Sequence, residues 1–212
     1  MIPLLHDFTD ETVLVVGGGP VGARKARTFA REARTVVVSP AFAERDFGDA
    51  ELVRAAPAPE EVADWVERFD PALVVAATDD DAVNEAVERA ARAAGALVNR
   101  ADRSGGREAG SVVVPATVRD DPVVAAVATG GAAPALSTEL RRRIESEIEG
   151  AGPMADLVAE IRADLKAAGM PPTDRREAVR AVVGSSAVWK ALQEGLSNAR
   201  QEANRVMEAT DD

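Results

Sequence analysis

The stretch Thr12–Ala26, TVLVVGGGPVGARKA, decides the fold of this chain. Its first five residues form a short apolar run, which is typical of a strand buried on both faces of a sheet. Gly17, Gly19 and Gly22 then follow the pattern G-x-G-x-x-G, and an alanine-rich segment with helical spacing comes after them. A strand, a glycine loop and a helix in this order predict a Rossmann fold whose loop binds a dinucleotide.

Each glycine of the loop has its own predicted role. Gly17 permits the tight turn out of the strand, Gly19 lets the backbone approach a pyrophosphate, and Gly22 lets the helix pack on the strand. The start of the helix, which includes Pro20 and Val21, offers a partial positive charge and free N–H groups to the phosphates. The alternative is a tight strand-to-helix turn that binds no ligand.

The residues expected to contact the ribose follow the second predicted strand, Thr35–Val38. An NAD site usually carries an acidic residue there, roughly 20 residues beyond the glycine loop. This chain instead continues with Ser39, Ala41 and Phe42, and we expect backbone groups of this segment to contact the ribose. Arg45 is a candidate partner for a 2′-phosphate, so the residues leave the choice between NAD and NADP open.

Strand-like and helix-like segments alternate as far as residue 99. Apolar runs at 12–16, 35–38, 52–53, 72–77 and 97–99 indicate strands, with helices between most of them, and this order predicts a parallel sheet. Thr78 follows the fourth run at the ligand-binding edge, where we expect it to contact the cofactor. We also expect Thr78 or Asp79 to cap the next helix.

The pattern changes near residue 110. Two strand-like runs, 111–116 and 122–128, have no room for a helix between them and are expected to pair antiparallel. A helix is predicted from Pro134, followed by a break at 150–153 and an all-helical remainder of one helix and then two more. The predicted domains are therefore residues 1–110 for NAD(P) binding, 111–150 as a small hairpin and helix segment, and 151–212 as a helical region.

Composition narrows the function classes. The net charge of −11 argues against a nucleic-acid partner, and the lack of cysteine excludes disulfides and thiolate chemistry. No apolar run is long enough to span a membrane and the start lacks signal-peptide features, so we expect a cytoplasmic protein. Only 3 of 25 basic residues are lysine, which indicates a salt-adapted, haloarchaeal-like source. His6 is the only histidine, and the spacing of His, Asp and Glu predicts no metal site.

Several segments together resemble the precorrin-2 dehydrogenase / sirohydrochlorin ferrochelatase family of siroheme synthesis. The resemblance covers about residues 1–150 and lies in segments 3–5, 15–26, 76–80, 97–102, 111–116 and 129–134. It implies an enzyme that oxidises precorrin-2, a tetrapyrrole, to sirohydrochlorin with NAD⁺, in some members with Fe²⁺ insertion. It also implies a homodimer, with residues 111–150 as the dimerisation segment.

The resemblance also implies roles for individual residues. The family's N-x-x-D motif falls on Asn99 and Asp102, which makes Asp102 the expected catalytic carboxylate. Asn99, Ser111, Gly130 and Gly131 are the expected substrate-binding residues. The alternative for Asp102 is an ordinary loop or helix-capping aspartate.

The substrate's carboxylates suggest cationic partners, and Arg103 and Arg107 are candidates for this contact.

Two other functions are consistent with the fold: a Rossmann oxidoreductase with another substrate, and a nucleotide-sensing regulatory domain. A sensing domain usually carries an acid after the second strand and lacks a later G-G-x-x-P segment, and this chain shows the reverse in both respects.

Overall fold

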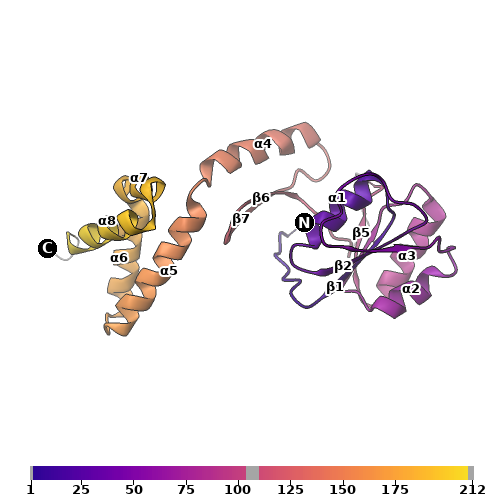
Figure 1. Ribbon diagram of the computed structural model, residues 1–212, viewed down its shortest axis with the longest axis horizontal. Coiled ribbons are helices and arrows are strands. Elements are labelled where there is room, and N and C mark those ends of the chain that lie inside the picture. The colour runs from indigo at the N-terminus through magenta and orange to yellow at the C-terminus, as the bar shows by residue number, and fades with distance from the viewer. Residues whose placement is uncertain (1, 104–109, 210–212) are drawn as a thin grey trace. The chain divides into compact units, whose positions relative to one another are not determined.

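The computed structural model in Figure 1 describes residues 2–103 and 110–209. The chain divides into two compact units, Met1–Val114 and Pro115–Asp212. The first unit contains a parallel sheet with its covering helices. The second contains a two-stranded hairpin and five helices.

A five-stranded parallel sheet forms the centre of the first unit, in the order β3-β2-β1-β4-β5. Its strands are β1 (Thr12–Val16), β2 (Arg34–Ser39), β3 (Glu51–Arg54), β4 (Leu73–Ala76) and β5 (Leu97–Arg100). The chain runs outward from β1 to β3 and then returns to β4 on the other side of β1. The carboxyl ends of β1 and β4 therefore flank a topological switch point, where open α/β sheets bind ligands. The predicted Rossmann-like α/β fold is confirmed.

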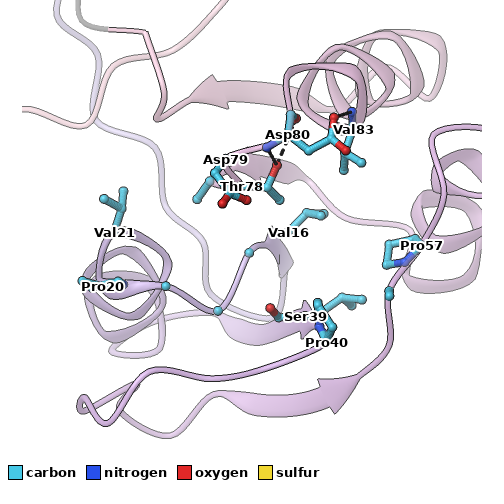
Figure 2. A pocket seen from close by; sticks show the side chains of 16 residues that line it. Val16, Pro20, Val21, Ser39, Pro40, Pro57, Thr78, Asp79, Asp80 and Val83 are labelled. Carbon is cyan, nitrogen blue, oxygen red and sulfur yellow. Dashed lines mark hydrogen bonds between the residues drawn. The ribbon is translucent and has the colours of Figure 1, made fainter.

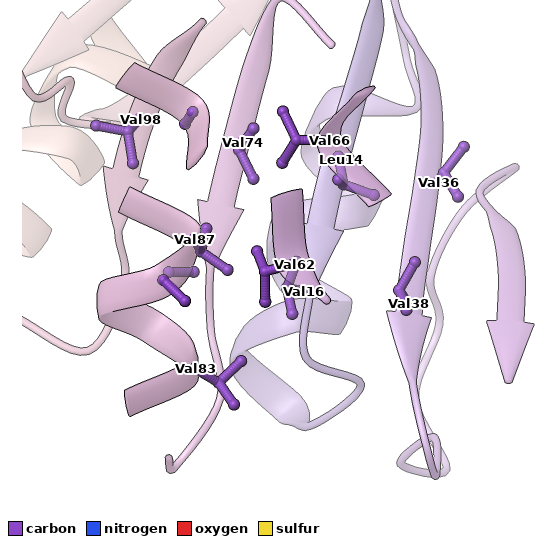
Figure 3. Packing of buried hydrophobic residues seen from close by; sticks show 13 residues of the cluster. Leu14, Val16, Val36, Val38, Val62, Val66, Val74, Val83, Val87 and Val98 are labelled. Carbon is purple, nitrogen blue, oxygen red and sulfur yellow. The ribbon is translucent and has the colours of Figure 1, made fainter. Parts of the chain in front are cut away.

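Helices cover both faces of this sheet, and β1 shows why. Successive side chains of a strand point to opposite faces, and all of Val13–Val16 are buried. Val13 and Val15 pack with α1 (Pro20–Phe29) on one face. Leu14 and Val16 pack on the other face with α2 (Val62–Phe69) and α3 (Asp81–Ala93), as Figure 3 shows. The continuous apolar run of β1 is thus explained by burial on two sides.

The second unit opens with an antiparallel hairpin of β6 (Ala116–Asp120) and β7 (Val123–Val127). The predicted hairpin exists, but its first strand was placed wrongly at 111–116. Ser111 instead forms an isolated parallel bridge with Val98, and Val112 and Val114 pack against the core of the first unit. The apolar pattern of this segment therefore reflects packing at the edge of the parallel sheet and not pairing with β7.

Helices form the rest of the second unit. They are α4 (Pro134–Glu147), α5 (Ala151–Ala167), α6 (Pro172–Gly184), α7 (Ser186–Glu194) and α8 (Leu196–Glu208). Residues of α5 to α8, including Leu157 and Ile161, form a separate buried cluster. None of the described helices is long and apolar enough to cross a membrane.

Two helix boundaries differ from the sequence expectation. The break predicted at 150–153 lies at 148–150 instead, since α4 ends at Glu147 and α5 begins at Ala151. Helix α5 keeps Pro153 in its first turn, where the missing N–H costs nothing. Three helices, not two, follow α5. The last of them escaped prediction because the residues that α8 buries, Ala199 and Ala203, are small and give a weak apolar pattern.

Candidate functional site

A pocket of about 560 Å³ lies at the carboxyl ends of β1, β2 and β4. Figure 2 shows three walls of this pocket: Pro20 and Val21 at the start of α1, Ser39 and Pro40 at the end of β2, and the turn after β4 that carries Thr78. The lining residues are Val16–Val21, Val38–Pro40, Ala56, Pro57, Ala77–Asp80 and Val83. This is the volume and position expected for a small-molecule site in such a fold.

Two glycines of the loop are required by packing within the protein. Gly17 has a φ of +123°, and a Cβ there would lie 2.3 Å from the carbonyl oxygen of Ala77, which directly follows β4. A Cβ on Gly22 would lie 1.9 Å from the carbonyl oxygen of Gly17. The tight turn and the close helix–strand packing predicted for these two residues are therefore present in the structure.

Gly19 differs from both of these glycines. It precedes α1 with a φ of −74°, which any residue adopts, and a Cβ there would meet no protein atom within 4 Å. Nothing inside the described protein requires glycine at this position. A ligand that approaches the backbone closely would require it, and the first-turn N–H groups of α1 lack acceptors within the helix. The residues therefore fit a pyrophosphate at this point.

The segment after β2 contributes to the pocket through fewer residues than expected. Ser39 lines it, and its hydroxyl donates a hydrogen bond of 2.7 Å to the carbonyl oxygen of Ala41. Ala41 and Phe42 are absent from the lining. Both lie against Gly18, where a Cβ would be 2.3 Å from the Ala41 oxygen and 2.8 Å from the Phe42 ring. Sequence reasoning missed Gly18, which fits this narrow space because it has no side chain.

The turn after β4 is held by Asn84, which is fully buried on α3. Its Nδ2 donates to the carbonyl oxygen of Thr78 at 2.9 Å, and its Oδ1 accepts from the backbone N–H of Thr78 at 3.2 Å and from the hydroxyl at 2.9 Å. Neither residue expected to cap α3 does so, because Asp80 accepts the N–H groups of Ala82 and Val83. Asn84 carries no sequence signal, since an asparagine inside a helix is usually a surface residue.

Asp102 follows β5 at the same edge of the sheet as the pocket, but it is not among the pocket's lining residues. Both of its carboxylate oxygens accept hydrogen bonds from Arg100, at 2.9 Å from Nε and 2.6 Å from Nη2. These bonds hold the pKa of the Asp102 carboxyl below its usual value, although burial acts to raise it. A carboxylate held in this way stays ionised and can accept a proton.

The four expected substrate-binding residues occupy different surroundings. Asn99 is 3% exposed, and its Nδ2 donates to the carbonyl oxygen of Val112 at 2.8 Å. Its Oδ1 is buried and has no hydrogen-bond partner among the described residues. Ser111 lies beside β5 through the bridge to Val98. Gly130 and Gly131 belong to the second unit, where both have a positive φ between β7 and α4.

The two arginines expected to bind substrate carboxylates and the residue types that could bind a metal were located in the structure. Arg103 lies 3.8 Å from Glu85, a loose ion pair at the surface, and Arg107 is outside the described residues. Within residues 2–103 and 110–209, no group of three or more His, Cys, Asp or Glu side chains could hold a metal ion.

The fold and the pocket together define a dinucleotide-binding protein of the Rossmann class. A family model described as "Putative NAD(P)-binding" matches residues 4–116, which is more than half of the chain. The chain therefore belongs to this NAD(P)-binding family.

Curated relatives support the resemblance seen in the sequence. The chain is 36% identical to a siroheme synthase of Methylococcus capsulatus over 215 residues, 99% of this chain and 43% of the relative. It is 37% identical to a siroheme synthase of Stutzerimonas stutzeri over 173 residues, 78% of this chain and 35% of the relative. The chain thus spans less than half the length of these relatives.

Among solved structures, SirC, a precorrin-2 dehydrogenase, is similar to this chain with a TM-score of 0.71 and 22% sequence identity. The match covers 99% of this chain and 100% of the SirC chain, which shows a shared fold.

Proposed function

We propose that this protein is an NAD-dependent dehydrogenase that oxidises precorrin-2 to sirohydrochlorin in siroheme synthesis. The observation that carries the proposal is a carboxylate, Asp102, which Arg100 holds at the same sheet edge as a pocket suited to a dinucleotide. The siroheme synthases that match this chain, and the fold shared with a precorrin-2 dehydrogenase, support this substrate class.

The residues that would hold the dinucleotide line three sides of the pocket. The loop from Gly17 to Gly22 and the start of α1 would bind the pyrophosphate through backbone N–H groups and the helix dipole. Ser39 would lie near the adenine-side ribose, and Thr78 would lie across the pocket from the loop. When bound, the nicotinamide ring supplies a hydride acceptor for the substrate carbon. We propose NAD⁺ as this cofactor, since no arginine that could bind a 2′-phosphate is among the described residues that line the pocket.

Oxidation of a carbon–carbon single bond removes a hydride and a proton. We propose that Asp102 accepts the proton, because its carboxylate is ionised and its side chain is still 16% exposed to solvent. Asn99 belongs to the proposed substrate-binding set, and its Oδ1 lacks a hydrogen-bond partner among the described residues. Ser111, Gly130 and Gly131 complete the proposed substrate-binding set.

An anaerobic assay tests the proposed function. Purified protein is mixed with precorrin-2 and NAD⁺ or NADP⁺, and sirohydrochlorin absorbance and NAD(P)H formation are followed together. We expect stoichiometric formation of both products with NAD⁺. Asp102→Asn should lose roughly 100-fold or more in kcat while it keeps its affinity for NAD⁺. Absence of turnover with either cofactor would exclude the proposal, and a parallel reaction of sirohydrochlorin with Fe²⁺ tests metal insertion separately.

We also propose that the chain forms a homodimer through the segment 111–150. Its helix α4 buries no residue among those described, and Leu136 on this helix is 51% exposed. Leu140 and Ile144 follow Leu136 at helical spacing and are not buried either. Such a row of open apolar side chains on one helix face is suited to a subunit interface. Light scattering should give twice the mass of one chain, and Leu136→Glu should shift the protein towards the monomer. A monomeric wild-type protein at micromolar concentration would contradict this part of the proposal.

A further inference from the structure

A chain of alternating charges lies behind Asp102. Arg100, the last residue of β5, has a side chain that is only 3% exposed. It donates two hydrogen bonds to Asp102 and a third, from Nη1, to Oε2 of Glu88 on α3 at 2.9 Å. The other oxygen of Glu88 accepts from Arg92 at 2.9 Å. Two guanidinium groups and two carboxylates thus form one network.

The contact between Arg100 and Asp102 has a defined geometry. Nε and Nη2 each bond a different oxygen of the carboxylate, and such a two-point contact fixes the plane of the carboxylate as well as its position. Lysine offers a single ammonium group and cannot make this contact. Glu88, whose side chain is 11% exposed, fixes the opposite end of the guanidinium, so Arg100 itself has little freedom to turn.

We propose that Arg100, anchored by Glu88, is a positioning residue that orients the Asp102 carboxylate for catalysis. The proposal rests on the proposed function, in which Asp102 takes a proton from the substrate. Arg100 acts through Asp102, because each of its three side-chain nitrogens donates to one of the two carboxylates.

The charges around Asp102 favour the ionised form of its carboxyl group. Hydrogen bonding by Arg100 is the largest influence that lowers the pKa of the Asp102 carboxyl, and the charge of Arg103 acts in the same direction. On α3, Glu88 is paired with Arg100 and Glu85 lies 3.8 Å from Arg103, so both carboxylates are balanced by a cation. Asp102 therefore stays ionised to a lower pH than a free aspartate, and the enzyme keeps its base under acidic conditions.

The test compares the wild-type chain with Arg100→Gln, Arg100→Lys and the control Arg92→Gln, which removes the cation of the network that does not contact Asp102. The titration of the Asp102 carboxyl is followed by ¹³C NMR, and Asp102→Asn identifies its signal. We expect Arg100→Gln to raise the midpoint by about 1 to 3 pH units, because an adjacent guanidinium lowers an aspartate pKa by this amount. Arg100→Lys should restore part of the effect, and Arg92→Gln should leave the midpoint nearly unchanged.

The second readout is the acidic limb of kcat/KM for precorrin-2, which should move upward with the NMR midpoint in Arg100→Gln. A purely structural role would change the melting temperature and leave this limb in place, and that result would overturn the proposal. If Arg100→Gln does not fold, the NMR titration of the wild-type protein is the remaining test. An Asp102 carboxyl that titrates near the ordinary aspartate value of about 3.9 overturns the proposal. If the wild type does not act on precorrin-2, the proposed function fails, whereas the NMR titration still shows whether Arg100 stabilises the ionised carboxylate.

Discussion

Two glycine-to-alanine substitutions in the glycine loop separate an effect on stability from an effect on ligand binding. Gly22 and Gly19 lie three residues apart, yet an added methyl group meets different surroundings at each. At Gly22 a Cβ would lie 1.9 Å from the carbonyl oxygen of Gly17, whereas at Gly19 it would meet no protein atom within 4 Å. We therefore expect Gly22→Ala to affect stability and Gly19→Ala to affect dinucleotide affinity.

The magnitudes follow from these distances. Ordinary contact begins near 3.4 Å, so the backbone at Gly22 or Gly17 must move by about 1.5 Å to admit the new methyl group. Such overpacking against backbone costs about 3 kcal/mol and lowers the melting temperature by about 6 to 12 °C for a chain of this size. Gly19→Ala should change the melting temperature by about 2 °C or less, because only a helix-capping preference is affected.

The effect of Gly19→Ala on binding comes from the approach of the pyrophosphate to the backbone. Loss of one hydrogen bond to a charged group costs about 1.5 to 3 kcal/mol, which corresponds to roughly 10- to 100-fold weaker binding. Thermal unfolding without ligand and calorimetric titration with NAD⁺ measure the two quantities on the same samples.

Two results would refute this reasoning. An unchanged affinity for NAD⁺ in Gly19→Ala would show that the pyrophosphate does not lie against the start of α1. An unchanged melting temperature in Gly22→Ala would show that the loop and helix are not packed as closely as described.

Three further predictions concern other parts of the chain. Asn84→Asp puts a carboxylate oxygen against the carbonyl of Thr78 in place of a donor, so it should destabilise the protein by about 1 to 3 kcal/mol in urea unfolding and weaken NAD⁺ binding. Leu157→Ala removes a fully buried side chain from the helical cluster and should cost about 2 to 5 kcal/mol, with NAD⁺ affinity unchanged because the pocket lies in the other unit. Burial raises the pKa of Glu88, but its bonds to Arg92 and Arg100 outweigh this and hold it below 4.5. Its contribution to stability is therefore present above that pH and lost as the pH falls through the lower folded-state value, so Glu88→Gln should flatten the acidic side of the stability curve measured by urea unfolding.

Much of the fold could be predicted because its signals are local. Burial on both faces makes β1 and β4 continuous apolar runs, and the glycines mark the turn that joins β1 to α1. The same locality explains the errors. The apolar run from Ser111 has the pattern of a strand in any surroundings, and only the packed structure shows that it lies beside β5 and leaves β6 to begin at Ala116.

The sequence by itself determined the class of the protein, since the spacing of Gly17, Gly19 and Gly22 between a strand and a helix predicts a Rossmann fold and indicates a dinucleotide site. It also indicated Asp102 through a resemblance. Only the tertiary structure brought Asn84 to Thr78 and placed Arg100 between Asp102 and Glu88. The physical reason is that these contacts depend on how α3 packs against β4 and β5, and no local pattern in either segment encodes the partner of a buried polar side chain.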